Sequence, residues 1–291
     1  MTDEAIEQPP ADAADELLHI DPHVHTLASD GVHEVETMIQ AAIAVGLDAV
    51  AIADHERLDA AVAGQAMAQY RGWPIEVIVA EEISTRGGHL LGLYLKHRIR
   101  PWYSLKDSIA RVHEQGGLAV IAHPLPPYPL CASEGTIRKL MDEADPIYHP
   151  DGIEGFNPTT AGPALRHWSR RAPALAEELG IAATGGSDAH KAENVGTTQT
   201  LVRRRGTVEE SLRRALRERD TRWQGEVYSW RGQVGMFGQQ TRKNLAALAA
   251  ELNGKVRRNG TGRDLGYPGG RHRPVAFDRD AAGLPPKDER A

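Results

Sequence analysis

The sequence predicts an α/β fold, arranged as a seven-stranded (β/α) barrel with a C-terminal extension. Three observations favour it. From Leu17 to about Asp220, short apolar runs alternate with amphipathic stretches, the pattern of parallel strands joined by helical crossovers. Seven such strands are predicted, and a helix follows most of them. A doubly wound open sheet gives the same alternation and is the alternative architecture.

The predicted strands are rich in Val, Ile and Leu, as strands covered on both faces should be. In chain order they are residues 17–21, 49–53, 75–80, 90–95, 118–122, 152–156 and 181–184. Amphipathic periodicity predicts helices over residues 34–45, 59–70, 105–115, 137–143, 163–179 and 208–219. Four of these helices are followed by the glycine expected just beyond a helix end, at Gly46, Gly72, Gly116 and Gly180.

Composition divides the chain into four regions. Residues 1–17 form an acidic N-terminal tail, residues 18–220 the barrel, residues 221–252 a helical extension, and residues 253–291 a tail rich in Gly, Pro and Arg. The last region lacks apolar periodicity, so we expect it to be loosely ordered. Residues 255–291 hold nine Lys or Arg against five Asp or Glu, a net charge of +4, and contact with an anionic partner is the less favoured alternative to a solvated tail.

Several protein classes are excluded by composition. The apolar runs fall far short of the roughly 20 residues that a membrane span needs. The net charge of −6 argues against a chain that coats nucleic acid through bulk charge. Six acids and no base precede Leu17, unlike a secretory or transit peptide, and the chain has one cysteine. We therefore expect a cytoplasmic protein without a membrane partner.

Histidine and acidic residues gather where the predicted strands end. In order, these segments are Asp21-Pro22-His23-Val24-His25, Asp54-His55, Glu81-Glu82, His123-Pro124 and Ser187-Asp188-Ala189-His190. A lone His is more often structural than a metal ligand. Because the carboxyl ends of all strands of a parallel barrel open on one face, however, these segments should converge there. His23 and His25 are two residues apart, so on a strand both rings point to the same side and can share one ion.

The residue types indicate a metal centre. Imidazole nitrogen combined with carboxylate oxygen suits Zn, Mn and Fe, whereas the lack of clustered cysteines argues against a closed structural zinc site. The chain also lacks the G-x-S-x-G nucleophile elbow and the P-loop. The expected catalytic nucleophile is therefore a metal-bound water and no side chain, since a metal ion lowers the pKa of bound water from about 15.7 to about 7.

These motifs together resemble one known family. The segments His23-Val24-His25-Thr26, Ser29-Asp30-Gly31, Ala53-Asp54-His55, Glu82-Ile83-Ser84, Ala122-His123-Pro124 and Gly186-Ser187-Asp188-Ala189-His190 occur in the order and near the spacing of the PHP (polymerase and histidinol phosphatase) superfamily. The resemblance covers Leu18 to about Arg219. It implies a distorted seven-stranded (β/α) barrel and a phosphoesterase that uses two or three divalent ions, commonly Mn, Zn or Fe.

The resemblance also implies a ligand set. One ion would be held by His23, His25, Glu82 and Asp188. Glu82 would bridge to a second ion bound by His123, and Asp30, His55 and His190 would hold a third. The sixth strand offers only Asn157 as a further, weak ligand of the second ion.

Four other residues are candidates for lesser roles. Asn157 is a weak ligand or a residue that supports the ligands. His89, at the start of the fourth strand, is expected to orient ligands more than to bind metal. Arg86 and Lys191 lie beside ligand motifs and are candidates for gripping a phosphate, although a solvated loop charge is the simpler interpretation of each. Glu81 should point to the opposite side of the strand from Glu82.

The predicted function follows from charge. Three divalent ions bring +6 and the carboxylates of Asp30, Glu82 and Asp188 return −3, so the site attracts a phosphate. We expect hydrolysis of a small phosphomonoester, such as a nucleotide or a metabolite phosphate. The alternatives are a histidinol-phosphate phosphatase, a 5′-directed exonuclease, or a non-catalytic PHP module that stabilises a larger assembly. A nucleic-acid partner is less favoured than a small phosphorylated substrate.

Overall fold

The computed structural model describes residues 16–160 and 166–225, which belong to the first of two units of the chain, Met1–Glu226. Most of the predicted N-terminal tail, most of the helical extension and all of the C-terminal tail lie outside the described residues. None of the described helices is long and apolar enough to cross a bilayer.

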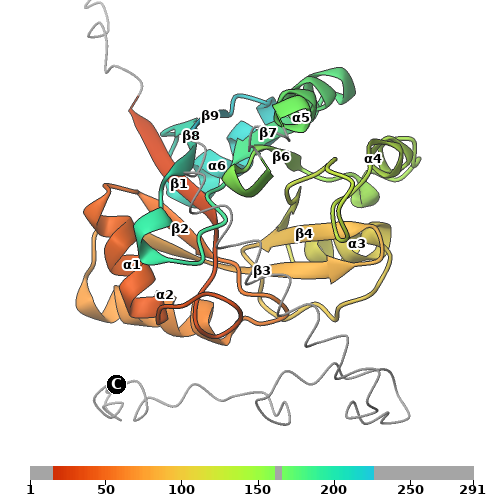
Figure 1. Ribbon diagram of the computed structural model, residues 1–291. Helices are drawn as coiled ribbons and strands as arrows, with labels where there is room; N and C mark the ends of the chain where they lie inside the picture. The colour runs from red at the N-terminus through yellow and green to blue at the C-terminus, as the bar shows by residue number, and fades with distance from the viewer. Residues whose placement is uncertain (1–15, 161–165, 226–291) are drawn as a thin grey trace, which may run out of the picture. The chain divides into compact units, whose positions relative to one another are not determined.

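The described unit is a nearly closed, barrel-shaped mixed sheet with helices around it (Figure 1). Its strands are Leu17–Val24 (β1), Ala49–Ile52 (β2), Glu76–Thr85 (β3), Gly88–Leu93 (β4), Leu118–Ile121 (β5), Gly152–Phe156 (β6), Ala182–Gly185 (β7), Thr198–Arg203 (β8) and Arg222–Gly225 (β9). Their spatial order is β7-β6-β5-β4-β3-β2-β1-β8-β9. The two ends of this order approach each other, because β7 contacts both β8 and β9.

The barrel prediction is confirmed, with two corrections. All seven predicted strands are present, but two more, β8 and β9, extend the sheet: β8 pairs antiparallel with β1, and β9 pairs antiparallel with β8. In addition, β4 runs antiparallel to both of its neighbours, β3 and β5. Only two residues separate β3 from β4, and a parallel pair would need a crossover of a dozen residues or more. Because β4 is antiparallel to both neighbours, β3 and β5 point in the same direction. Strands β5, β6 and β7 therefore run in the same direction as β1, β2 and β3.

The helices are Val35–Ala44 (α1), Asp59–Arg71 (α2), Leu105–Glu114 (α3), Glu134–Met141 (α4), Arg166–Leu179 (α5) and Val208–Glu218 (α6), with short 3-10 turns at Pro146–Tyr148 (η1), Pro158–Thr160 (η2) and Ala192–Asn194 (η4). Each agrees with a predicted helix except at its ends. The first turn of α4 lies three residues earlier than predicted, because Ser133 accepts a hydrogen bond from the Thr136 amide and caps it there. Residues 161–165, at the start of the predicted fifth helix, are not described.

The core has an inner and an outer layer because side chains alternate along the strands. On β2, Ala49 and Ala51 face an interior cluster, whereas Val50 and Ile52 pack with α1 and α2. The interior cluster also contains Leu212, Ala215 and Leu216 of α6, which pack with the first residues of β5 and β7. Helix α6 therefore covers the end of the barrel at which these strands begin, and the opposite end is left for the site.

Candidate metal centre

The sequence-predicted ligands meet at the carboxyl ends of the strands. Groups of His, Asp and Glu whose donor atoms all lie within 4.8 Å of one another comprise His23, His25 and Asp188; His25, Asp30 and His190; His25, His55 and Glu82; and Glu82, His89 and His123. All eight predicted ligands belong to these groups, together with His89. The residues come from β1, β3, β4 and from the loops after β1, β2, β5 and β7, so the strand directions described above bring them together.

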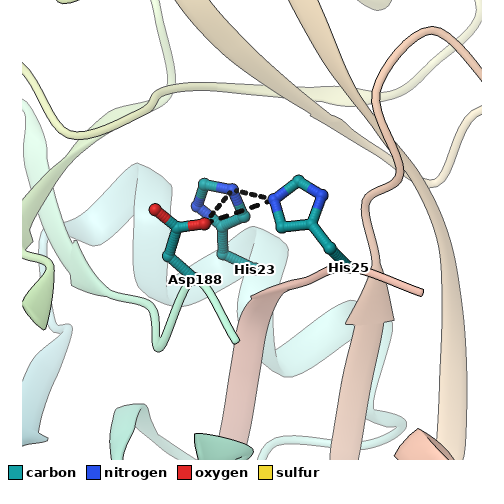
Figure 2. A group of neighbouring side chains, drawn as sticks. All are labelled: His23, His25 and Asp188. Carbon is teal, nitrogen blue, oxygen red and sulfur yellow. Dashed lines mark hydrogen bonds and ion pairs between the residues drawn. The ribbon is translucent and has the colours of Figure 1, made fainter. Parts of the chain in front are cut away.

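His23, in β1, and His25, directly after β1, point to one side and face Asp188 (Figure 2). Their Nε2 atoms are 3.0 Å apart and lie 3.5 and 3.3 Å from Oδ1 of Asp188. Oε2 of Glu82 completes the set, 3.2 Å from His23 and 3.1 Å from His25. Four ligands about 2.1 Å from a tetrahedrally coordinated ion would lie about 3.4 Å from one another. The five distances given, between the two histidines and from each histidine to Asp188 and to Glu82, match the spacing of ligands around one small cation.

Glu82 divides its two oxygens between two groups. Oε2 faces His23, His25 and His55, whereas Oε1 lies 2.7 Å from Nδ1 of His89 and 2.9 Å from Nε2 of His123. Burial alone would raise the pKa of this carboxyl, but the surrounding imidazoles outweigh burial and hold the pKa well below its usual range. Glu82 is therefore an ionised carboxylate in the position of a bridging ligand.

A third group lies on the other side of His25. Oδ2 of Asp30 is 3.0 Å from Nε2 of His190 and 3.8 Å from Nε2 of His55. Burial lowers the pKa of His55 to about 4, so this imidazole is neutral at physiological pH and can offer a lone pair. Nδ1 of His25 is buried and has no hydrogen-bond partner among residues 16–160 and 166–225; it lies 3.5 Å from Oδ1 of Asp30.

These observations test whether divalent cations fit the site. A buried imidazole nitrogen without a partner is costly unless something else binds it. Here it faces a carboxylate inside a cluster of imidazoles and carboxylates, which is the environment of a cation ligand. The donor set is nitrogen and oxygen only, as Zn, Mn and Fe accept. The residues present therefore fit divalent cations. The groups differ in part from those that the resemblance implied, because His55 lies with His25 and Glu82, and His89 joins Glu82 and His123.

His89 lies among the donors themselves rather than behind them. Its Nδ1 is 2.7 Å from Glu82 Oε1 and 3.4 Å from Nε2 of His123. The sequence predicts that His89 orients ligands more than it binds metal. Because β4 is antiparallel, its first residues lie at the same end of the barrel as the last residues of β3. The short Arg86-Gly87 connection was the sequence signal for this hairpin.

The sixth strand contributes a residue that sequence reasoning missed. Glu154, 1% exposed, accepts a hydrogen bond from Nδ1 of His23 at 2.9 Å and another from the backbone amide of His123 at 2.7 Å. Asn157 donates to the same carboxylate at 2.9 Å, and its amide nitrogen lies 3.4 Å from Oδ2 of Asp188. Asn157 therefore turns its amide nitrogen, not its oxygen, towards the centre and supports the donors instead of joining them. A charged residue in the middle of an apolar strand was the signal for Glu154.

Two aspartates fix the loops that carry the donors. Asp54 accepts hydrogen bonds from the amide of Thr26 and the hydroxyls of Thr26 and Ser29, and so shapes the turn that presents Asp30. Asp21 accepts from the amides of Ser187 and Gly196, at the two ends of the loop that carries Asp188 and His190. Buried carboxylates that bind several backbone amides hold a loop in one conformation.

The remaining candidates lie apart from the donors. Glu81 points away from Glu82, as predicted, and accepts the amide of Ile99 at 2.8 Å. Arg86 and Lys191 are exposed, and Lys191 lies 3.8 Å from Glu193. No contact joins either cation to the donor groups within the described residues. The chain's one cysteine, Cys131, places Sγ 3.6 Å from Nδ1 of His123, on the ring edge away from Glu82.

Comparison with known proteins agrees with this geometry. The sequence signature of the PHP domain matches residues 21–123, and that of the PHP-associated region matches residues 166–221. The chain is 32% identical over 148 residues to the uncharacterized protein MJ1587 of Methanocaldococcus jannaschii, an alignment that covers 46% of this chain and 84% of that protein. The chain belongs to the PHP superfamily.

Solved structures show the same PHP fold. A two-domain Bacteroides vulgatus protein, described as containing a predicted PHP-like metal-dependent phosphoesterase, superposes with a TM-score of 0.59 at 20% identity, over 75% of this chain and 68% of that one. PsfC from Pseudomonas syringae superposes with a TM-score of 0.53 at 19% identity, over 79% of this chain and 99% of that one. The barrel predicted from the strand pattern is thus the PHP barrel.

Proposed function

We propose that this PHP protein hydrolyses a small phosphomonoester with the help of two or three divalent ions, Mn, Zn or Fe. The observation that carries the proposal is the division of Glu82 between two donor sets, with a third set around Asp30. His23, His25 and Asp188 would hold one ion with Glu82, His89 and His123 a second with Glu82, and Asp30, His55 and His190 a third. When bound, such ions neutralise phosphate oxygens and acidify a coordinated water.

Charge supports a phosphate as the group bound at this centre. Asp30, Glu82 and Asp188 are buried, and nearby histidines hold the pKa of each well below its usual range against the opposing effect of burial. They therefore contribute three negative charges, against six positive charges from three divalent ions. The excess of three positive charges in a water-poor site favours a doubly charged phosphomonoester over a neutral substrate.

The chain's own residues supply rigidity. Hydrogen bonds of Glu154 with His23 and of Asn157 with Asp188 hold these two donors in place. Asp54 binds the loop that carries Asp30, and Asp21 binds the loop that carries Asp188 and His190. Asp188 and His123 adopt left-handed backbone conformations, with φ of 52° and 25°. Such conformations persist only where the surroundings enforce them, and they concentrate at functional sites. Rigid donors keep the ions, and hence the bound phosphate, in one geometry.

A screen of phosphorylated metabolites and short oligonucleotides with added Mn tests the proposal. We expect phosphate release from at least one small monoester, loss of that activity on chelation, and its return with Mn. Asp188→Asn should lower the rate by orders of magnitude, whereas Glu81→Gln, on the far side of β3, should retain it. Hydrolysis that survives chelation, or equal rates in the two variants, would contradict a metal-dependent reaction. Release only from oligonucleotides would replace the small substrate by a nucleic acid.

A further inference from the structure

A second cavity lies at the opposite end of the barrel from the metal centre. Its volume is about 430 Å³, and it opens between the last turns of α3 and α6 and the first residues of β5, β6 and β7. Leu118 begins β5 at this cavity, and His123 follows the other end of the same strand. At about 3.3 Å per residue of strand, the cavity and the metal centre are more than 10 Å apart.

Three arginines of α6 and its C-terminus line this cavity. Arg213 is held by Glu209 and by the carbonyl of Gly116, and its guanidinium stacks on Tyr94. Arg217 lies one turn further along the same face, and Arg219 caps the helix. Neither of these two has an ion-pair partner in the part of the chain that the structure describes.

The acidic side chain of the cavity does not offset these charges. Asp151 accepts hydrogen bonds from Nε2 of His113 at 2.9 Å and from the amide of Ala119 at 2.7 Å. Burial lowers the pKa of His113, but Asp151 outweighs burial and raises this pKa, so the carboxylate of Asp151 is directed at His113 and not at the arginines. The cavity therefore keeps the positive charge of Arg217 and Arg219.

The backbone at Arg219 points to a use for its side chain. Arg219 has a left-handed conformation, with φ of 60°, at the position where α2 ends in Gly72 with φ of 62°. This conformation disfavours every residue that has a Cβ, and glycine is the usual residue there. The guanidinium lies over Gly180: a Cβ built on that glycine would be 3.0 Å from Nη1 of Arg219. A strained arginine beside a glycine at a cavity mouth is a feature of binding sites.

We propose that this cavity binds a small phosphate-bearing anion with an apolar or aromatic body, such as a mononucleotide, independently of the metal centre. Arg217 and Arg219 supply charge-assisted hydrogen bonds to the phosphate. Leu118, Met141, Ile181 and Leu216 line the cavity and receive the apolar part of the ligand. The volume lies within the range of small-molecule sites, about 300 to 1,000 Å³. The inference goes beyond the proposed hydrolysis and does not depend on it.

Titration calorimetry on the full chain with AMP and with inorganic phosphate, before and after chelation, tests this site. We expect AMP binding that persists after chelation, is tighter than phosphate binding, and weakens about tenfold or more in Arg217→Ala/Arg219→Gly. Glycine suits the left-handed position, so this variant should melt at or above the wild-type temperature, which separates lost binding from unfolding. The matched control is Arg214→Ala, because Arg214 has the same charge and helix but pairs with Glu218 outside the cavity.

Three results would overturn the proposal. AMP binding that disappears entirely on chelation would assign all binding to the metal centre. Equal weakening in Arg214→Ala would indicate general charge attraction and no site. Unchanged AMP affinity in the double variant would exclude the two arginines as phosphate ligands. Each result leaves the hydrolysis proposal untouched, because that proposal is tested at Asp188 with metal present.

Discussion

Glu81 and Glu82 show how one residue step along a strand separates two chemical environments. Glu82 faces five imidazoles and remains ionised. Glu81 faces the other side, where burial raises its pKa well above the usual range, only partly opposed by the amide of Ile99. The raised pKa favours the protonated carboxyl, which resembles glutamine in shape and charge. Substitution of Glu81 by Gln is therefore a matched control for substitution of Glu82 by Gln, with the same chemical change on the opposite face.

The contacts of Glu154 lead to a second prediction at the residue scale, about metal affinity. Its carboxylate accepts from the ring of His23 and from the backbone of His123, so Glu154→Gln places an amide donor against other donors. Partners that orient metal ligands contribute about 10- to 100-fold to metal affinity. We expect Mn or Zn affinity, measured by chelator competition, to fall by that factor while the melting temperature changes little. Wild-type affinity in Glu154→Gln would exclude the orienting role.

Individual residues also show which parts of the site could be predicted from the sequence and which could not. The eight predicted ligands meet because each lies at or near the carboxyl end of a strand. His89 lies instead at the start of the antiparallel strand β4, and Glu154 was missed because its partners, His23 and the amide of His123, are far away in the sequence. Side-chain hydrogen bonds between distant segments depend on strand order, which periodicity does not reveal.

At the scale of elements, the end of β7 packs closely against β1. A Cβ built on Gly186 would lie 2.3 Å from Oε1 of Glu154 and 2.9 Å from Cβ of His23. Gly186→Ala should therefore lower the unfolding free energy by about 1 to 3 kcal/mol and weaken metal binding through Glu154 and His23. Urea unfolding and chelator competition measure the two effects. The control is Gly135→Ala in α4, where the nearest atom to a new Cβ is 4.0 Å away and no loss of either is expected.

A second element-scale prediction concerns the pair that joins α3 to the start of β6. The raised pKa of His113 means that its protonated form is stabilised in the folded state. The resulting stability is complete below the unfolded pKa of about 6.5 and is lost as the pH rises through the folded value. The unfolding free energy should fall over that window, and Asp151→Asn should reduce the fall. An identical pH profile in wild type and Asp151→Asn would show that the pair makes no such contribution.

Strands could be predicted from the sequence where consecutive residues are all apolar and buried. Strands such as Ala49–Ile52 are apolar along their length and are recognisable without a structure. Strands β8 and β9 were not predicted because their residues are mostly polar: in β8, Thr198 and Thr200 are buried without being apolar, and β9 contains Trp223 as its one large apolar residue. Polar strands of this kind are fixed by pairing with neighbouring strands, here β8 with β1 and β9 with β8, and not by their own pattern.

Across the whole described unit, the two ends of the barrel have opposite electrostatic character. Buried carboxylates and imidazoles, which bind cations, lie together at the carboxyl ends of the strands. Guanidinium groups, which bind anions, lie together at the end covered by α6. The strands between them hold each set in place through the interior apolar cluster. This arrangement places two differently charged sites on one scaffold without mutual contact, so each can be disabled separately.

The metal content of the purified full chain, measured by mass spectrometry for wild type, Glu82→Gln and Glu81→Gln, tests the central claim most directly. The claim is that Glu82 bridges two of the three donor sets. The account predicts two or three divalent ions per chain in wild type and in Glu81→Gln, and about two fewer in Glu82→Gln, because Glu82 serves two sets. Wild-type protein without bound Mn, Zn or Fe after growth in their presence, or equal metal content in the two variants, would contradict it.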